Sequence, residues 1–119
     1  MTTGLTEQQQ REAASRCRQQ RRRILEVSQK VDALHVAPAF SCLELVDAVL
    51  NYCVDQPVSG ADAFILSKGH GAMAHYVVLE SLGVLDPSRV NRISQSGSTV
   101  GGHPDRGIPG IIASTGSLG

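Results

Sequence analysis

The sequence predicts an α/β domain in which helices cover a parallel sheet, and two observations support this fold class. The first is the short run Ala63-Phe64-Ile65-Leu66, which is apolar on both faces, as are strands buried inside parallel sheets. The second is the abrupt change to the polar, glycine-rich segment Ser67–Gly71, which is followed by apolar residues at helical spacing from Met73 to Leu82. A buried strand that empties into a tight loop and opens a helix is therefore expected near the middle of the chain.

A long basic helix is expected before this strand, over residues 6–34. Thr6 and Gln9 have the spacing of a capping box, and the residues that follow are rich in helix formers. One apolar stripe runs along the second half of this helix: Ile24, Val27, Val31 and Leu34. This stripe predicts the face that packs against the rest of the domain.

The chain is expected to leave the helical conformation over Leu34–Phe40, because Pro38 disfavours helical backbone at the residue before it. Ser41 and Glu44 have the spacing of a second capping box. A second buried helix is therefore predicted from Ser41 to about Val54.

After the central helix the sequence becomes less regular. Gly83 is a predicted helix stop, and Asp86-Pro87 is a cap and first-turn proline that open a short helix to about Ile93. Seven glycines then lie between Ser94 and Gly119. So long an irregular segment is uncommon in a compact domain unless it serves a site.

Composition limits the classes of function. The chain has 119 residues, enough for one domain, with 11 basic and 11 acidic residues. Residues 1–30 carry a net charge of about +4 and the remainder about −4. We expect the arginines of the first helix to face solvent or a partner subunit rather than nucleic acid, because aromatic residues for base stacking are scarce.

The cysteines and the apolar runs bear on location. Cys17, Cys42 and Cys53 have neither the spacing of a metal site nor that of a secreted disulfide framework, so reduced thiols in a cytoplasmic protein are expected. No apolar run is read as a membrane span or as a signal peptide, so no membrane partner is expected.

Three of the four histidines lie at predicted breaks between elements: His35, His70 and His103. Imidazole donates or accepts near neutral pH, so these residues suggest a polar pocket for hydroxyls, phosphates or proton transfer. A zinc site is an alternative, although the spacings are wide. His75 lies one turn into the central helix and is expected to be a packed or surface residue.

Three segments together give the chain a resemblance to a known family. They are Phe64-Ile65-Leu66-Ser67-Lys68-Gly69-His70-Gly71, Gly102-His103-Pro104-Asp105 and Ala113-Ser114-Thr115-Gly116-Ser117-Leu118-Gly119. In this order and at about this spacing, they resemble the N-terminal, diphosphate-binding part of transketolases, notably the split forms in which that part is a separate subunit. Of the family's Ser-Gly-His-Pro-Gly-Gly segment, only the histidine remains in Ala33–Pro38.

The resemblance implies roles for particular residues. It implies a cofactor-binding set, with His70 at the diphosphate of thiamine diphosphate: Ser67, His70, Gly116, Ser117 and Leu118. It implies that the catalytic residues lining the channel are His35 and His103. The same two histidines, with Asp105, are implied to bind the sugar substrate.

The resemblance also implies a reaction and partners. The reaction is transfer of a two-carbon ketol unit from a ketose to an aldose. In the family, the ligands of the Mg²⁺ joined to the diphosphate and the glutamate that activates the cofactor follow the segment matched here. We therefore expect a thiamine-diphosphate-binding fold that is incomplete at its C-terminus over residues 1–119. We also expect it to be inactive without other transketolase-like subunits in a hetero-oligomer.

Two other interpretations remain open from the sequence. One is a non-catalytic assembly or regulatory subunit of such a complex. The other is a general phosphate-binding module without thiamine chemistry. A partner chain that begins with the family's metal-binding segment would favour the enzyme.

Overall fold

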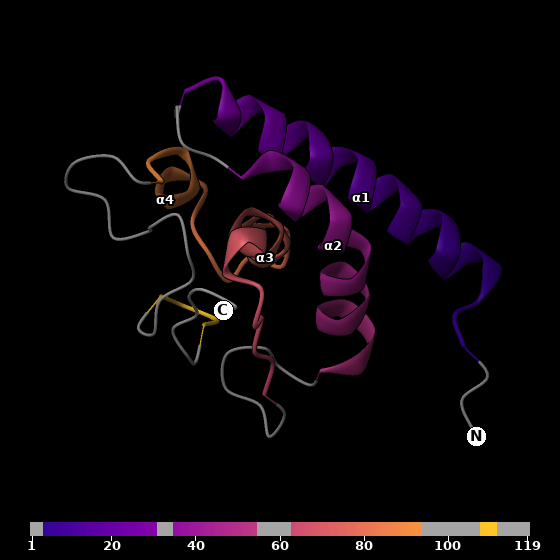
Figure 1. Ribbon diagram of the computed structural model, residues 1–119. Helices are drawn as coiled ribbons and strands as arrows, with labels where there is room; N and C mark the ends of the chain where they lie inside the picture. Colours follow the sequence, from indigo (N-terminus) through magenta and orange to yellow (C-terminus); the bar gives the residue numbers. More distant parts are fainter. Residues whose placement is uncertain (1–3, 31–34, 55–62, 94–107, 112–119) are drawn as a thin grey trace.

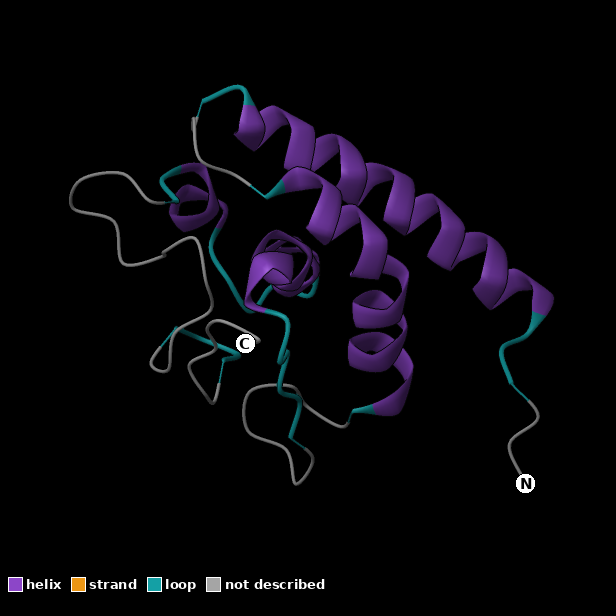
Figure 2. Cartoon of the chain, viewed as in Figure 1, coloured by secondary structure: helices purple, strands orange, loops and turns teal. Residues whose placement is uncertain are grey.

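The computed structural model describes residues 4–30, 35–54, 63–93 and 108–111, and the regular structure in these ranges is helical (Figures 1 and 2). The elements in chain order are α1 (Glu7–Ser28), α2 (Val36–Ala48), the π-helical turn η1 (Val49–Cys53), the 3₁₀ turn η2 (Gly69–Gly71), α3 (Ala72–Ser81) and α4 (Pro87–Asn91).

Helix α3 is the centre of the core. Every residue from Ala72 to Leu79 is buried, because α1, α2 and α4 all pack against this helix (Figure 1). Tyr76 and Leu79 have no exposed surface, and the buried set continues into α4 through Val90 and into Ile93 beyond it. A helix that is covered on all sides needs no amphipathic pattern, and α3 has none.

The predicted parallel sheet is wrong for the part of the chain that the structure describes. The run Ala63–Leu66 forms neither strand nor helix there, and no other described segment is a strand (Figure 2). A strand requires a neighbour that pairs with its backbone. In these ranges, Leu66 and Phe64 instead pack against the helical core, and Ile65 remains 58% exposed. In these ranges, the apolar run therefore contributes Phe64 and Leu66 to the helical core rather than forming a strand.

Helix α1 begins as predicted. The Thr6 hydroxyl accepts from the Gln9 N–H at 3.1 Å, and the Gln9 side chain accepts from the Thr6 N–H at 2.8 Å, which confirms the capping box. The helix ends at Ser28, earlier than expected. Ile24 and Val27 lie in the core, whereas the remainder of the predicted stripe, Val31 and Leu34, lies outside the described residues.

Helix α2 begins at Val36, and the prediction of a start at Ser41 is wrong. Pro38 lies in the first turn, where backbone N–H groups have no partner within the helix, so the missing N–H costs no helical bond. Ser41 does not cap a helix; its hydroxyl donates to the Pro38 carbonyl at 2.8 Å.

A buried carboxylate joins α1 to α2. Asp47 has a side chain that is 1% exposed, and its two oxygens accept from the Arg16 guanidinium at 3.1 and 2.8 Å. Gln20 donates to the same carboxylate at 3.0 Å and to the Ser81 hydroxyl of α3 at 3.2 Å. The carboxylate raises the pKa of Arg16 above its usual range through these hydrogen bonds.

The ends of α3 and α4 agree with the sequence. Gly83 follows α3 with φ of 76°, a left-handed conformation that favours glycine. Asp86 caps α4 by accepting from the Ser88 N–H at 2.8 Å, with Pro87 in the first turn. The hydrogen bonds that Asp86 accepts from the N–H and the hydroxyl of Ser88 lower the pKa of Asp86.

One helical run is longer and more apolar than the sequence analysis predicted. Val36–Cys53 has 18 residues and a mean hydropathy of 1.3, which by length and composition alone suffice for a membrane span. In the structure, this run contains the ion-paired carboxylate of Asp47 and packs against α1 and α3. These contacts account for the buried part of the run, which is 28% of it.

His75 is a packed residue of the core. It is 1% exposed, its ring meets the Phe64 ring edge-on at 5.1 Å between centroids, and neither ring nitrogen has a hydrogen-bond partner in the described structure. Burial disfavours the charged imidazolium and lowers the pKa of His75 to about 4.

We expect Arg16→Met to lower the free energy of unfolding by about 3 kcal/mol, because it leaves the buried Asp47 carboxylate without its counter-ion. The matched control is Arg11→Met, which removes an ion pair whose side chains are 69% and 85% exposed, and which should change stability little. Urea unfolding followed by circular dichroism measures both. Equal losses in the two variants would contradict the role given to Asp47.

We also expect His75 to make stability depend on pH between its unfolded pKa of about 6.5 and its folded pKa of about 4. In this window the unfolded chain binds the proton and the folded chain does not, so stability falls as pH falls, by up to about 3 kcal/mol. Urea titrations across the window should show a shallower slope for His75→Leu than for the wild-type chain. An identical slope would remove His75 as the cause.

Candidate functional site

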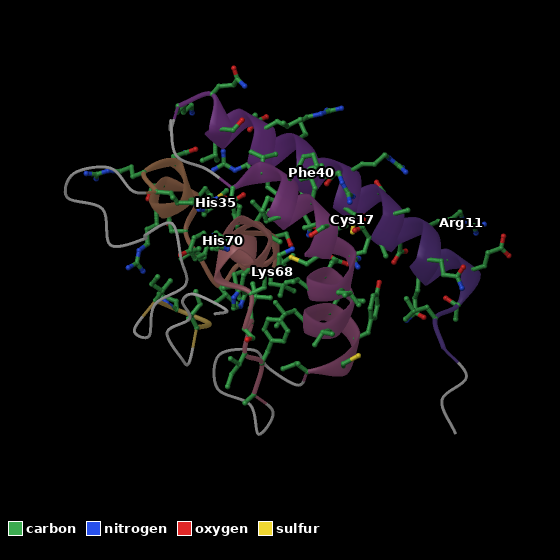
Figure 3. The ribbon with its side chains drawn as sticks, in the orientation of Figure 1. Arg11, Cys17, His35, Phe40, Lys68 and His70 are labelled. Atoms are coloured by element: carbon green, nitrogen blue, oxygen red, sulfur yellow. The ribbon has the colours of Figure 1, made fainter. Side chains whose placement is uncertain are left out.

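Two of the predicted site residues, His35 and His70, lie side by side in the structure. Their ring centroids are 4.5 Å apart and the rings meet edge to face at 83° (Figure 3). His35 is the residue that precedes α2, and His70 lies in the turn η2 that precedes α3. Both residues are exposed, so the pair is accessible to a ligand.

The packing of α2 against α3 positions this pair. Ala39, Leu43 and Val46 of α2 are buried in the core that surrounds α3. Because His35 directly precedes α2 and His70 lies in the turn before α3, the approach of the two helix starts brings the two rings together. The sequence suggested that the loop histidines line a polar pocket; the structure brings His35 and His70 together, and the pocket itself stays a prediction.

The turn that carries His70 is tightly built. Gly71 donates its N–H to the Lys68 carbonyl at 2.9 Å, which closes the turn at the start of α3. A β-carbon at Gly71 would lie 2.8 Å from the Cys42 sulfur, closer than such contacts occur. Gly71 is therefore required for the close approach of α2, rather than for its backbone angles.

Cys42 is a packing residue at this junction. Its thiol approaches the Pro38 and Ala39 carbonyls at 3.5 and 3.6 Å, and burial raises the pKa of the Cys42 thiol. A thiol of raised pKa is protonated and unreactive at neutral pH. Sequence reasoning gave Cys42 no role, and its helical spacing with other apolar residues of α2 was the available signal.

Ser67 is exposed beside the same turn. Together, Ser67 and His70 offer hydroxyl and imidazole groups at the amino end of α3, where helix N–H groups favour an anion. These residue types fit the oxygens of a diphosphate. The described residues contain no group of three His, Cys, Asp or Glu side chains that would hold a metal ion.

The other predicted site residues lie outside the described residues: His103, Asp105, Gly116, Ser117 and Leu118. Their roles stay predictions.

A separate groove of about 400 Å³ lies between α1 and α2. Ala13, Ala14 and Cys17 of α1 face Ala48 and Tyr52 across it, and neither His35 nor His70 contributes to it. Burial raises the pKa of the Cys17 thiol to about 11. The lining also includes the charged residues Arg21, Glu44 and Asp47, and these charges are paired: Arg21 with Glu44, and Asp47 with Arg16.

Comparison with known proteins identifies the family. Residues 21–119 match the family described as "Transketolase, thiamine diphosphate binding domain". The chain is 35% identical over 104 residues to an apulose-4-phosphate transketolase subunit from Phocaeicola vulgatus, covering 83% of this chain and 37% of that protein. It is 32% identical over 102 residues to a transketolase of Physarum polycephalum, covering 80% of this chain and 15% of that protein.

A further relative carries a different name. The protein called ferredoxin fas2 of Rhodococcoides fascians is 37% identical over 107 residues, covering 88% of this chain and 33% of that protein. The chain thus spans well under half the length of these three relatives. No solved structure matches it.

We expect Gly71→Ala to lower the free energy of unfolding by about 1–3 kcal/mol, because the added methyl group overlaps the Cys42 sulfur. In the Cys42→Ala background the sulfur is gone, so the same substitution should cost much less. Urea unfolding of the two single variants and the double variant measures this coupling. A cost that is the same in both backgrounds would contradict the packing described here.

Proposed function

This chain belongs to the transketolase thiamine diphosphate binding domain family, and on that premise we propose that it is one part of a transketolase. In this proposal the complete enzyme transfers a two-carbon ketol unit from a ketose to an aldose. The observation that carries the proposal for the described residues is the exposed His35–His70 pair at the starts of α2 and α3.

The roles proposed for the chain's residues follow from their chemistry. His70 and Ser67 donate hydrogen bonds to diphosphate oxygens at the amino end of α3. His35, beside His70, contacts the sugar or exchanges a proton with its hydroxyl groups. When bound, thiamine diphosphate supplies the carbanion chemistry of ketol transfer.

We propose that other chains complete the site. Mg²⁺ prefers several oxygen ligands, and the described residues contain no cluster that provides them. The likeness to a protein that is itself named as one subunit of a transketolase supports a partnership with further transketolase-like subunits. Cys17, Cys42 and Cys53 are all unpaired thiols, which supports a reducing, cytoplasmic location.

We expect the isolated 119-residue chain to transfer no ketol unit and to bind thiamine diphosphate weakly. After reconstitution with the subunits identified by mass spectrometry of the native complex, His70→Ala should weaken cofactor binding by about 1–3 kcal/mol, the range for a hydrogen bond to a charged group. Isothermal titration calorimetry with thiamine diphosphate and Mg²⁺ measures this loss. Lys30→Ala, a substitution of an exposed residue just after α1, is the control.

Two outcomes would overturn parts of this proposal. Ketol transfer by the purified chain alone would show that no partner is needed. A native complex whose cofactor affinity is unchanged by His70→Ala, and which keeps its composition, would favour a non-catalytic role in assembly.

A further inference from the structure

The side chain of Lys68 is directed at the start of α2 (Figure 3). Its ammonium group donates to the Pro38 carbonyl at 3.0 Å and to the Ser41 hydroxyl at 2.6 Å. Two of its three N–H donors are thus engaged with another helix.

The three residues form a closed set of hydrogen bonds. Ser41 accepts from Lys68 and donates to the Pro38 carbonyl, which also accepts from Lys68. Hydrogen bonds from an ammonium group are stronger than bonds between neutral groups. Lys68 is half-buried, so these bonds are partly shielded from water.

This set connects the two segments that carry the histidine pair. Pro38 lies in the first turn of α2, three residues after His35, and Lys68 immediately precedes the turn that contains His70. Gly71 ties the far side of that turn to the Lys68 carbonyl at 2.9 Å. A change in the Lys68 side chain therefore acts on His70 relative to His35, with little effect on the distant end of either helix.

We infer that Lys68 is a positioning residue: its bonds to Pro38 and Ser41 hold the Gly69–Gly71 turn so that the His70 and His35 rings meet edge to face. The functional meaning of the pair rests on the proposed function, but the positioning itself does not. Loss of the lysine side chain would leave the helical fold intact and free the Gly69–Gly71 turn to move.

Nuclear magnetic resonance of the full chain with ¹³C-labelled histidine tests this without any cofactor. Rings that meet edge to face shift each other's C–H resonances, so His35→Asn should move the His70 signals in mildly alkaline buffer. We expect Lys68→Met to move the His70 signals to the positions seen in His35→Asn. Lys68→Arg should restore part of the wild-type shift, because it keeps the donors.

Two controls separate positioning from general stability. Lys30→Met removes an exposed lysine that lies just after α1 and should leave the His70 signals in place. Ser28→Ala removes a hydroxyl that donates to a backbone carbonyl at 2.6 Å, matched to Ser41→Ala, and should also leave them. We expect Ser41→Ala to move the His70 signals part of the way, with unchanged helical circular dichroism.

Three results would overturn the inference. The first is unchanged His70 signals in folded Lys68→Met. The second is movement that occurs only together with loss of helical signal in both Lys68→Met and Ser41→Ala, which makes the lysine an ordinary stabilising residue. The third is that Lys68→Met leaves the signals of both histidines unchanged, while inorganic diphosphate perturbs the spectrum of the wild-type chain but not that of Lys68→Met. That result would make the ammonium group an anion ligand instead.

Discussion

Asp47 is a charged residue with only 1% of its side chain exposed, and the arrangement of the three longest helices depends on compensating that charge. Arg16 and Gln20 of α1 both donate to the Asp47 carboxylate of α2. Because a buried charge without partners costs several kcal/mol, α1 cannot shift along α2 without a large penalty. Gln20 extends the constraint to α3 through the Ser81 hydroxyl. Farther along α1, Arg23 forms a bidentate ion pair with Glu80 of α3 and so holds these two helices together.

The histidine pair is a consequence of this helix packing, refined by local bonds. Burial of apolar side chains is non-directional, so it brings the starts of α2 and α3 together without selecting a ring orientation. Directional contacts are needed for that, and the structure provides them at the same junction. Gly71 has no β-carbon, so the Cys42 sulfur can pack against it, and the Lys68 ammonium group connects the turn to Pro38. A site built in this way is sensitive to single-atom changes in residues that need not touch a ligand.

His70 and His75 show how environment separates two identical side chains that are close in sequence. His70 is exposed at the amino end of α3 and meets His35, whereas His75 is enclosed in the core against Phe64. Burial without a hydrogen-bond partner in the described structure keeps His75 neutral and lowers its pKa to about 4, so it contributes packing and a sensitivity to acid. An exposed imidazole remains able to donate and accept, which is what a phosphate or sugar hydroxyl requires.

Local rules recovered the features that depend on neighbouring residues. The capping box at Thr6, the glycine stop at Gly83 and the Asp86 cap all follow from hydrogen bonds within a few positions, so the sequence by itself determined them. The motif around His70 likewise pointed to the family that residues 21–119 match. Features that depend on distant partners were decided by tertiary structure alone. The apolar run before Ser67 was predicted to be a strand, yet in the described residues Phe64 and Leu66 pack against the helical core and Ile65 stays exposed, because hydrophobicity does not specify what covers a segment. The helix start at Val36 and the engagement of Lys68 with Pro38 also required the fold, since only it brings the turn before α3 against the first turn of α2.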